Sequence, residues 1–454
     1  MEELMRRHRE FMASRKSYEV EYRLRALGRM QEAIRHYEDE ICRAIYQDLG
    51  KARSESYMCE VGLTLKELSH VKRHLKGWAR TKHVGTGLAN FPAGSRIVQE
   101  PYGVVLIMSP WNYPFMLCME PLVGAIAAGN SVVLKPSNYS PATSAVIKKV
   151  VERAFEAGHV SVVEGGRAEN TALLEQKFDY IFFTGSKKVG RLVMEKAAKH
   201  LTPVSLELGG KSPCIVDRTA NLRMAAKRLA YGKYLNCGQT CVAPDYLLID
   251  EAVKDEFLNH YRRAVVRMYG ENPLENPDYG RIINEKHFQR LCGLVDEERI
   301  VLGGRTEPDK LRMEPTVMDR VTAEDAVMQE EIFGPILPVL TFHSMDEAER
   351  FVQVRPKPLA CYVFTSDSAV ERRFLRYVSF GGGCINDTIA HLVSQTMGFG
   401  GVGDSGMGSY HGKRSFQTFS HEKSILKKSV LVDMPMRYQP YKKVYTKIVK
   451  LIMH

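Results

Sequence analysis

A cysteine and a glutamate near the middle of this chain have the chemistry of an acyl-transfer site. Cys241 ends the segment NCGQTC at residues 236–241, and Glu207 lies in the strand-like run VSLELGG at residues 204–210. A thiol nucleophile and a carboxylate that activates water are the two groups needed to form a thioester and then hydrolyse it. We therefore predict Cys241 as the nucleophile and Glu207 as the general base.

The surroundings of both residues favour this interpretation over a structural one. Two leucines flank Glu207 and should face the other side of the strand, while Gly209 and Gly210 leave space beside it. A carboxylate shielded from water has a raised pKa, which suits a general base. A salt-bridged glutamate and a small buried cysteine are the ordinary alternatives, but polar side chains crowd the sequence before Cys241.

The loop SPWNYPF at residues 109–115 offers a donor for the oxyanion that such chemistry creates. It follows the apolar run at residues 103–108, and loops at the carboxyl ends of parallel strands line ligand crevices. Two prolines stiffen the loop, so Asn112 would present its amide N–H in a fixed direction. An isolated asparagine more often bonds its own turn. Beside Cys241 and Glu207, however, we predict Asn112 as the oxyanion donor.

Three further segments could hold a nucleotide. Lys135 ends the next strand-like run and could meet a ribose or phosphate, although a lone lysine is usually solvated. The loop TGSKKVG at residues 184–190 leads from a strand into a helix, where backbone N–H groups attract anions. It lacks the dinucleotide fingerprint and the Walker ending, and glycine also serves simple turns. In EEIFGP, at residues 330–335, Glu331 could bond a ribose and Phe333 could support a flat ring. An exposed acid beside a packed phenylalanine is the alternative there.

The order of the expected elements predicts an α/β fold. Residues 1–80 have apolar residues at helical spacing, and residues 84–101 look like a hairpin. From residue 103 onward, short apolar runs alternate with helix-like segments, which predicts a parallel sheet with helices on both faces. A second α/β unit extends from about residue 210 to 400, and an alternating run at 416–424 predicts a further strand. The helices expected in the first unit span residues 116–128, 144–157 and 191–199.

Composition excludes several classes of protein. The 454 residues are 44% apolar and 26% charged, which is ordinary for a globular protein of two or three domains. The net charge of +11 is concentrated in the tail, where eight Lys/Arg residues from Lys423 onward face only Asp433. A nucleic-acid groove through the body is therefore not expected.

Nine cysteines without a paired framework, a charged N-terminus and no apolar run of about 18 residues predict a cytoplasmic protein with reduced thiols. Cys237 and Cys241 lack further zinc ligands nearby, so no metal site is expected.

The last residues predict a basic amphipathic helix. Within residues 441–454 an apolar stripe at helical spacing is formed by Val444, Ile448, Leu451 and Ile452, and the lysines lie largely off it. Such a helix can lie on an anionic membrane surface, which would give a peripheral contact at the inner membrane surface. Packing against the chain's own body or a partner subunit is the commoner use of such a face.

In their order along the chain, these motifs resemble the aldehyde dehydrogenase superfamily over essentially the whole length. The matching stretches are PWNYP at 110–114, FTGS at 183–186, LELGGK at 206–211, GQTC at 238–241 and EIFGP at 331–335. The short length and the glycine-dense segment at 400–412 are similar to the class 3 branch, which acts on fatty and aromatic aldehydes. The resemblance implies two doubly wound parallel-sheet domains and a β segment that bridges the subunits of a homodimer.

The resemblance also implies domain limits. An NAD(P)-binding domain would comprise residues 1–80 and 100–207, and a catalytic domain residues 208–411. The oligomerisation hairpin and strand would be residues 81–99 and 412–430, followed by a basic tail at 431–454.

The reaction implied by the resemblance is NAD(P)-dependent oxidation of an aldehyde, medium- or long-chain aliphatic or aromatic, to the carboxylic acid. Cys241 would attack the carbonyl, and Asn112 with the Cys241 backbone N–H would hold the oxyanion. Glu207 would activate the water that hydrolyses the thioester. The cofactor, NAD or NADP, would be held by Ser109, Pro110, Trp111, Lys135, Asn138, Gly185, Ser186, Lys187, Lys188, Val189, Gly190, Leu208, Gly209, Glu331 and Phe333.

Two positions depart from the family pattern. Where the family often carries glutamate, this chain has Asn138, and a neutral side chain beside Lys135 removes repulsion of a 2′-phosphate, so NADP should be accepted as well as NAD. Cys237 stands where small or polar residues are common, and it could fill the core or form a temporary disulfide with Cys241.

The alternative functions are those of an acylating or reductive relative and of a non-catalytic scaffold at a membrane. The base Glu207 argues against the first, and retention of the whole catalytic set argues against the second.

Overall fold

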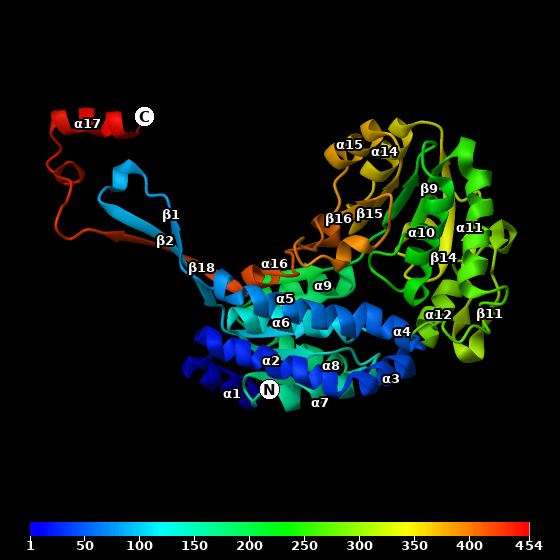
Figure 1. The fold of residues 1–454 in the computed structure, drawn as a ribbon, viewed down its shortest axis with the longest axis horizontal. Helices are drawn as coiled ribbons and strands as arrows, with labels where there is room; N and C mark the ends of the chain where they lie inside the picture. The colour runs from blue at the N-terminus through cyan, green and yellow to red at the C-terminus, as the bar shows by residue number, and fades with distance from the viewer. Residues whose placement is uncertain (454) are drawn as a thin grey trace.

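Helices at the N-terminus and two parallel sheets make up most of the molecule, which a computed structural model describes over residues 1–453 (Figure 1). The helical start expected from the sequence is confirmed. Its α-helices are α1 (Glu2–Ala13), α2 (Val20–His36), α3 (Glu38–Leu49), α4 (Arg53–Ser56) and α5 (Gly62–Trp78). Between α4 and α5 the chain forms a π-helical turn at Tyr57–Val61. α3 stops at Gly50, whose φ of 64° suits a residue without a side chain.

A six-stranded sheet follows in the order β17-β7-β6-β3-β4-β5, parallel except for β17. The strand order reverses between β3 and β6, and in doubly wound sheets the ligand crevice opens at such a point, beyond the strands' carboxyl ends. The strands are β3 (Val104–Met108), β4 (Ser131–Lys135), β5 (Val160–Val162), β6 (Tyr180–Thr184), β7 (Val204–Glu207) and β17 (Gly406–Met407). The connecting helices are α6 (Met116–Ala128), α7 (Pro141–Ala154), α8 (Arg167–Leu174) and α9 (Lys187–Ala198).

Alternate residues of each strand enter different cores, as expected for a sheet covered on both faces. In β3, Val105 and Ile107 join the core under α2, α5, α6 and α7, whereas Val104 and Leu106 join the core under α1, α8 and α9. This two-sided burial explains why the strand was recognisable as an uninterrupted apolar run.

Two helices of this unit begin earlier than predicted. α7 starts at Pro141, three residues early, because proline suits a first helical turn and Asp48 accepts backbone N–H groups there at 2.8 and 3.2 Å. α9 starts at Lys187, four residues early, because Ser186 caps it by accepting the N–H of Val189. The predicted loop at 184–190 is therefore a strand end followed by the first turn of a helix.

A second, seven-stranded sheet has the order β10-β13-β14-β9-β8-β15-β16, parallel except for β10. Its strands are β8 (Pro213–Val216), β9 (Tyr246–Asp250), β10 (Ile300–Leu302), β13 (Thr316–Met318), β14 (Ile336–Phe342), β15 (Ala360–Phe364) and β16 (Gly382–Ile385). A small hairpin is formed by β11 (Thr306–Glu307) and β12 (Arg312–Met313).

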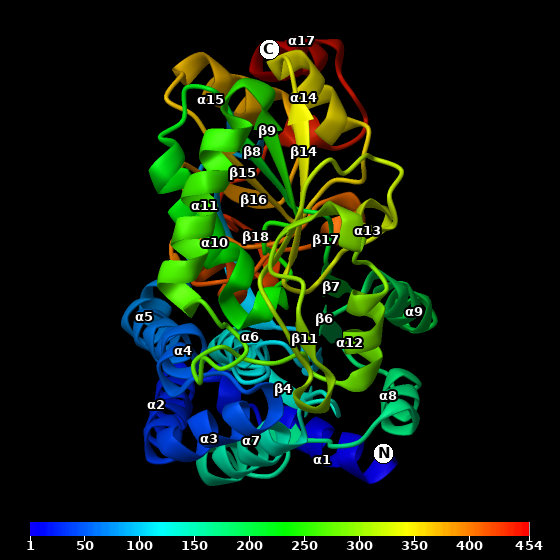
Figure 2. The same ribbon diagram turned by 90° about the vertical axis from the view of Figure 1, so that its right-hand side faces the viewer.

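Helices cover both faces of this second sheet (Figure 2). One face packs against α10 (Leu222–Tyr234) and α11 (Lys254–Tyr269). The other packs against α12 (Glu285–Cys292), α13 (Ala326–Gln329), α14 (Met345–Gln353) and α15 (Ser368–Tyr377). The predicted α/β class with two parallel sheets is thus confirmed.

A three-stranded antiparallel sheet projects from the body as an arm (Figure 1). It contains β1 (Lys82–Val84), β2 (Ala93–Pro101) and β18 (Ser420–Lys428), and α17 (Lys443–Met453) lies at its far end. The predicted hairpin is confirmed, since β1 pairs with β2. Across residues 1–453 no helix is both long enough and apolar enough to cross a membrane.

The strand predicted at 416–424 is wrong in its first part. Residues up to Thr418 belong to helix α16 (Lys413–Thr418), and the strand starts only at Ser420. The helix forms here because Ser415 accepts the backbone N–H of His411 at 2.8 Å and packs directly on Gly124 of α6, where no side chain intervenes. Packing against another helix has overridden the local alternation.

Candidate active site

The loop that carries Cys241 has a strained backbone that the surrounding residues hold in place. Asn236 and Cys237 both have φ of 53° and Gly238 has φ of 72°, so three successive residues are left-handed. This conformation is unfavourable for residues with side chains and persists where tertiary contacts enforce it. Gln239 supplies such contacts, because its amide donates to the carbonyls of Asn236 and Arg281 at 3.1 and 3.0 Å.

Asn112 lies against this loop. Its side-chain amide donates to the carbonyl of Gln239 at 3.0 Å, and its own backbone carbonyl accepts a bond from the Asn236 side chain at 2.8 Å. A carboxamide nitrogen carries two hydrogens. One hydrogen therefore anchors the side chain, and the other can be donated to an oxyanion formed at Cys241.

The Cys241 thiol lies in an environment that disfavours its charged form. Burial, followed by the negative charges of Glu331 and Glu207, raises its pKa to about 12, and the backbone N–H groups of Cys241 and Val242 oppose this rise. The thiol is consequently protonated at neutral pH. Because the thiolate is the nucleophilic form of a cysteine, a nucleophilic attack by Cys241 would require removal of the thiol proton.

Glu207 ends β7 and its side chain is buried, with 2% of its surface exposed. Neither carboxylate oxygen has a hydrogen-bond partner within residues 1–453, and burial alone raises its pKa well above the usual value. A carboxyl group without a partner and with a raised pKa is suited to accept a proton from water or from a thiol.

The space that Gly209 was expected to leave beside Glu207 is occupied by the carboxylate of Glu331. Gly209 leaves room for Glu331, whose side-chain oxygens lie where a β-carbon of residue 209 would stand. Burial and the charge of Asp245 raise the pKa of Glu331 to about 8, and a bond from the Gly210 backbone N–H opposes the rise. The expectation that Gly209 makes space for the base is therefore corrected.

An ion pair positions the segment that contains Glu331. Lys211 pairs with Asp245 and donates to the carbonyl of Glu330 at 3.0 Å, while Asp245 accepts the N–H of Ile332 at 2.9 Å. Phe333 then adopts a left-handed conformation, with φ of 50°. Its ring meets the ring of Trp111 edge-on at a centroid distance of 5.3 Å.

The start of α9 combines small residues with basic ones. Gly190 has no side chain where the methyl groups of Leu208 pack, with a β-carbon position only 2.7 Å from Leu208 Cδ2. Lys187 lies 3.7 Å from Asp404. Lys188 and Val189 complete this first helical turn. Ser186 accepts the N–H of Val189, and the N–H groups of Lys187 and Lys188, which have no partner within the helix, can bind an anion.

Lys135 is not the solvated lysine of the alternative interpretation. It is buried at the end of β4, and its ammonium donates to the carbonyls of Pro136 and Gly165 at 2.8 and 2.7 Å. Burial lowers its pKa. Asn138, three residues on, is exposed.

A small apolar cluster adjoins the loop that carries Cys241. Cys59, Tyr113 and Leu117 are buried together, with Met116 and Leu235 partly buried against them. The Tyr113 hydroxyl lies 2.7 Å from the hydroxyl of Thr240, the residue before Cys241. A buried apolar cluster therefore lies next to the residue that precedes Cys241.

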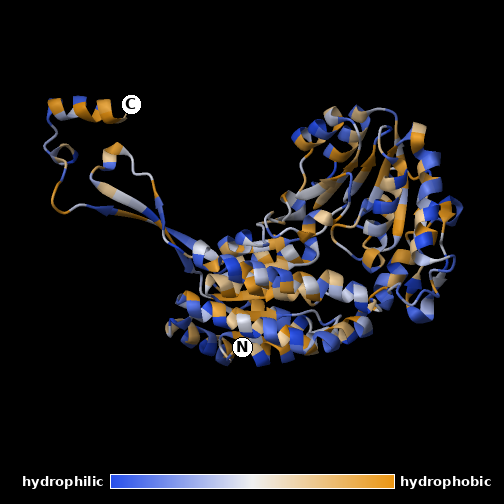
Figure 3. Cartoon of the chain, viewed as in Figure 1, coloured by the Kyte–Doolittle hydropathy of each residue, from blue (hydrophilic) through white to orange (hydrophobic). Residues whose placement is uncertain are grey.

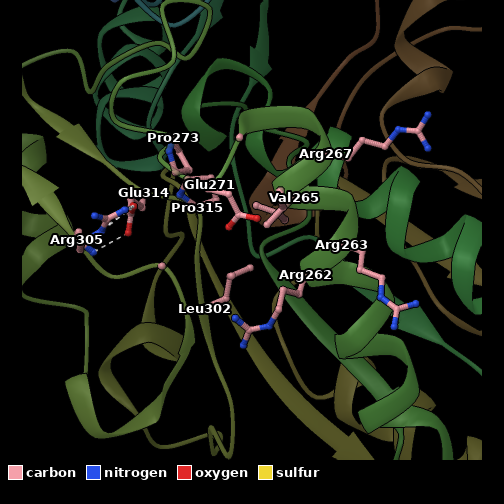
Figure 4. Close-up of a pocket in the computed structure, with 13 residues that line it drawn as sticks. Arg262, Arg263, Val265, Arg267, Glu271, Pro273, Leu302, Arg305, Glu314 and Pro315 are labelled. Carbon is pink, nitrogen blue, oxygen red and sulfur yellow. Dashed lines mark hydrogen bonds and ion pairs between the residues drawn. The ribbon is translucent and has the colours of Figure 1, made fainter.

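A surface cavity of about 600 Å³ lies elsewhere, beside α11, and contains none of these residues (Figure 4). Arg305 in that cavity is paired with Glu314 at 2.6 Å. The concentration of unpaired and strained groups around Cys241, rather than this cavity, marks the reactive site.

A family model described as "Aldehyde dehydrogenase family" matches residues 2–425. The chain belongs to the aldehyde dehydrogenase family. A curated aldehyde dehydrogenase from Staphylococcus aureus, 4,4'-diaponeurosporen-aldehyde dehydrogenase, is 48% identical over 434 residues, which cover 95% of each chain. The dimeric NADP-preferring aldehyde dehydrogenase of Rattus norvegicus is 43% identical over 96% of this chain and 97% of that protein.

The fold agrees with that of a solved aldehyde dehydrogenase. The structure of Staphylococcus aureus AldH in its substrate-bound state superposes with a TM-score of 0.98 and 46% identity, over 100% of this chain and 99% of that one. The resemblance to the class 3 branch is confirmed by the relatives, and the chain is an NAD(P)-dependent aldehyde dehydrogenase.

The site of this aldehyde dehydrogenase fits a polar ligand beyond the strand ends. Buried polar atoms normally have a hydrogen-bond partner, yet several oxygens here have none within residues 1–453. They are Ser109 Oγ, Thr184 Oγ1, Glu331 Oε1 and both carboxylate oxygens of Glu207. Relatives in the family use NAD or NADP, and such a cofactor carries hydroxyl and phosphate groups for these atoms and for the start of α9.

Several residues of the aldehyde dehydrogenase site were missed by the sequence analysis. Lys51, which donates to the Asn112 carbonyl, lies between α3 and α4, and Glu55, which accepts the Asn236 backbone N–H, lies in α4. Glu60, the ion-pair partner of Lys51, lies in the π-helical turn before α5. In the sequence, charged residues in such a helical segment look like a solvated helix face. Lys211 and Asp245 are 34 positions apart, and only the fold brings them together. Paired long-range charges leave no local signal in a single sequence.

Cys237 fills the core. It is buried in the cluster under α12 to α14, and its sulfur lies 3.4 Å from the β-carbon position of Gly280. Cys241 packs instead against the core shared with α10 and α11. The structure thus favours the core-filling alternative over a temporary disulfide.

Proposed function

We propose that the enzyme oxidises medium- or long-chain aliphatic or aromatic aldehydes to carboxylic acids through a thioester on Cys241. The observation that carries this proposal is the buried, unpaired carboxylate of Glu207, whose charge acts on the Cys241 thiol. A hydrolytic enzyme needs such a base, and a relative that hands its thioester to another acceptor gains nothing from it.

The steps follow from the two groups. The Cys241 thiol releases its proton to solvent water as its sulfur bonds to the aldehyde carbon. The carbonyl oxygen becomes an oxyanion, which accepts hydrogen bonds from the Asn112 side chain and from the Cys241 backbone N–H. When bound, NAD(P) supplies a nicotinamide ring that accepts the hydride. Glu207 then takes a proton from water as that water's oxygen attacks the thioester, and the carbon–sulfur bond breaks to release the acid.

The cofactor-binding residues are proposed from the same geometry. The Trp111 and Phe333 rings contact each other edge-on, and Leu208 packs on Gly190. We propose that these three side chains and Pro110 surround the flat nicotinamide ring near Glu331. The turn Gly185–Gly190, with Ser186 at the helix cap, is proposed to meet the pyrophosphate. Lys135 and Asn138 are proposed to meet the adenine ribose. The cofactor domain would thus comprise residues 1–80 and 100–207, and the catalytic domain residues 208–411.

The apolar cluster supports an apolar substrate. Cys59, Tyr113 and Leu117 would contact the substrate's hydrocarbon part, since they form an apolar cluster whose Tyr113 hydroxyl contacts Thr240, the residue before Cys241. A hydrocarbon chain entering this surface gains about 0.8 kcal/mol per buried CH₂ group. The specificity constant kcat/KM should therefore rise with the chain length of the aldehyde, up to the length at which the chain contacts the whole cluster.

A homodimer is proposed from the arm. Apolar side chains on it are strongly exposed, including Leu88, Phe91, Val430 and Leu431. These residues lie in the β1–β2 connection and just after β18, and an arm with so much exposed apolar surface gains stability when a second copy covers it. Residues 81–99 and 412–430 would form that interface.

Peripheral membrane contact through α17 is a second proposal. The helix lies at the end of the arm, away from the body, and combines apolar and charged residues (Figure 3). Val444 is 57% exposed and Leu451 is 83% exposed, which favours an external partner over packing on the chain itself. Basic amphipathic helices bind anionic lipid surfaces.

Formation of NADH from an aldehyde tests the proposed function. Purified enzyme with NAD and octanal or benzaldehyde should produce NADH and the free acid, and Cys241→Ala should abolish both while still binding NAD. NADH formation by Cys241→Ala, or dependence of turnover on added coenzyme A, would contradict the proposal.

A further inference from the structure

We propose that Lys51 and Glu60 are positioning residues for aldehyde oxidation, because their buried ion pair holds the Asn112 loop against the Cys241 loop. This inference rests on the proposed role of Asn112 as oxyanion donor. Neither residue touches the nucleophile, so both would act through the backbone that they bind.

The pair is deeply buried. Lys51 Nζ lies 2.7 Å from Glu60 Oε1, and the two side chains are 1% and 0% exposed. Burying two charges requires removing both from water, and a buried pair often adds little to stability compared with apolar residues of the same size. Such a pair is better explained by the geometry that it imposes.

Glu60 fixes the end of the Asn112 loop. Its second oxygen, Oε2, accepts the backbone N–H groups of Phe115 and Met116 at 2.9 and 3.3 Å, where α6 begins. A carboxylate at the start of a helix satisfies N–H groups that have no partner within the helix, and it interacts favourably with the helix dipole. These hydrogen bonds hold the C-terminal end of the loop that contains Asn112 against the π-helical turn at Tyr57–Val61.

Lys51 fixes the middle of the loop. Its ammonium donates to the backbone carbonyl of Asn112 at 3.3 Å and lies 4.0 Å from the centre of the Tyr113 ring. A lysine has three N–H donors, and Lys51 directs them to Glu60, to Asn112 and to the face of Tyr113. The direction of the Asn112 side chain follows from this backbone position.

The same short segment also supports the nucleophile loop. The carbonyl that Lys51 binds accepts the side chain of Asn236 as well, at 2.8 Å, and the Asn236 backbone N–H donates to Glu55 Oε1 at 2.9 Å. Residues 51–60 therefore contact both loops at the point where they meet. Loss of the charges would free Asn112 to move relative to Cys241.

The test measures hydride transfer in the first turnover of the holoenzyme. Lys51→Met with Glu60→Gln removes both charges together, so no unpaired charge stays buried, and glutamine still offers an oxygen to the N–H groups of α6. We expect the NADH burst to slow 10- to 100-fold, as for a displaced oxyanion donor. The Kd for NAD should change less than twofold. A burst within twofold of the unaltered enzyme would overturn the proposal.

A matched control separates positioning from general stability. Arg23 is a buried cation that binds the carbonyl of Ala127, at the opposite end of α6 from Glu60. Arg23→Met should lower the thermal midpoint yet leave the burst within twofold. If the double variant fails to fold, Lys51→Gln with Glu60→Gln replaces it, which again leaves no unpaired charge buried, with an expected slowing of about tenfold. An unaltered burst in that folded variant would then overturn the proposal.

A double-mutant cycle tests whether the pair acts through Asn112. In an Asn112→Ala background the donor is already absent, so the Lys51 and Glu60 substitutions should slow the burst less than twofold further. If the Lys51 and Glu60 substitutions slow the burst by the same factor with and without Asn112→Ala, their role is a general structural one, and the proposal is overturned. NADH formation by Cys241→Ala would instead contradict the proposed function, so the two failures are distinguishable.

Discussion

Gly406 pairs with Glu207 in an antiparallel register, so β17 closes the edge of the six-stranded sheet at the proposed base. Gly406 has φ of 143°, and a β-carbon there would overlap the carbonyl oxygen of Leu206. β17 can therefore pair with β7 only because residue 406 is a glycine, which has no side chain to meet the Leu206 carbonyl.

We expect Gly406→Ala to damage both folding and thioester hydrolysis. The substitution forces a conformation that is essentially restricted to glycine, with a cost of about 3 kcal/mol in the free energy of unfolding. Turnover should fall more than the NADH burst, because β17 moves away from Glu207. Urea unfolding and stopped-flow NADH absorbance measure the two effects.

Gly403→Ala is the matched control in the same loop. Gly403 also has a positive φ, 64°, but the nearest heavy atom to its β-carbon position is Lys357 Cδ at 3.6 Å. Its substitution should reduce the free energy of unfolding by only about 1 kcal/mol and leave hydrolysis intact. Equal behaviour of the two variants would contradict the proposed role of Gly406.

Burial of Glu207 predicts that hydrolysis becomes faster as the pH rises. Its pKa is raised well above 4.5, so the ionised form that takes a proton from water grows with pH. In single-turnover experiments between pH 6 and 9, the rate constant for acid release should increase with pH. Glu207→Gln should lose that increase along with most of its rate.

The same pKa shift has a consequence for stability. A raised pKa in the folded state means that folding favours the neutral carboxyl group. The stabilisation of the folded state by the neutral Glu207 is fully present below pH 4.5 and is lost as the pH rises through the raised pKa. The thermal midpoint of Glu207→Gln should therefore exceed that of the unaltered enzyme by an amount that increases with pH. A constant difference across pH would contradict a buried, unpaired Glu207.

The sequence predicted those parts of the site whose residues are close together in the chain. The strands leading to Asn112, Lys135 and Glu207 were readable because both of their faces are buried. The start of α9 was placed late because a single cap, Ser186, decides it. The role of the Lys51–Glu60 pair was not predictable. The two residues are only nine positions apart, but the backbone groups of Asn112 and Phe115 that they bind lie more than fifty positions away, and only the fold brings them together.

Asn138 predicts dual cofactor use. At the position proposed for it, beside the adenine ribose, the neutral Asn138 side chain would not repel a 2′-phosphate. The value of kcat/KM with NADP should therefore lie within about a hundredfold of the value with NAD, a difference of about 2.7 kcal/mol. Asn138→Glu should lower kcat/KM for NADP and leave that for NAD nearly unchanged. A preference of the unaltered enzyme for NAD above a hundredfold would contradict this role.

Removal of residues 441–454 tests the proposed membrane contact. Full-length enzyme should co-sediment with liposomes that contain anionic lipids, and binding should weaken at high salt because lysines contribute. The truncated enzyme should stay in the supernatant with normal aldehyde oxidation. Equal sedimentation of the two proteins would remove the membrane proposal.

Trapping the intermediate in Glu207→Gln tests the account most directly. Mixed with NAD and octanal, this variant should form about one equivalent of NADH per active site and then stall, since water is no longer activated. Mass spectrometry of the digested protein should find the acyl group on the peptide containing Cys241, with Cys237 unmodified. Continued turnover at the unaltered rate, or an acyl group on any other residue, would contradict a thioester on Cys241 hydrolysed by Glu207.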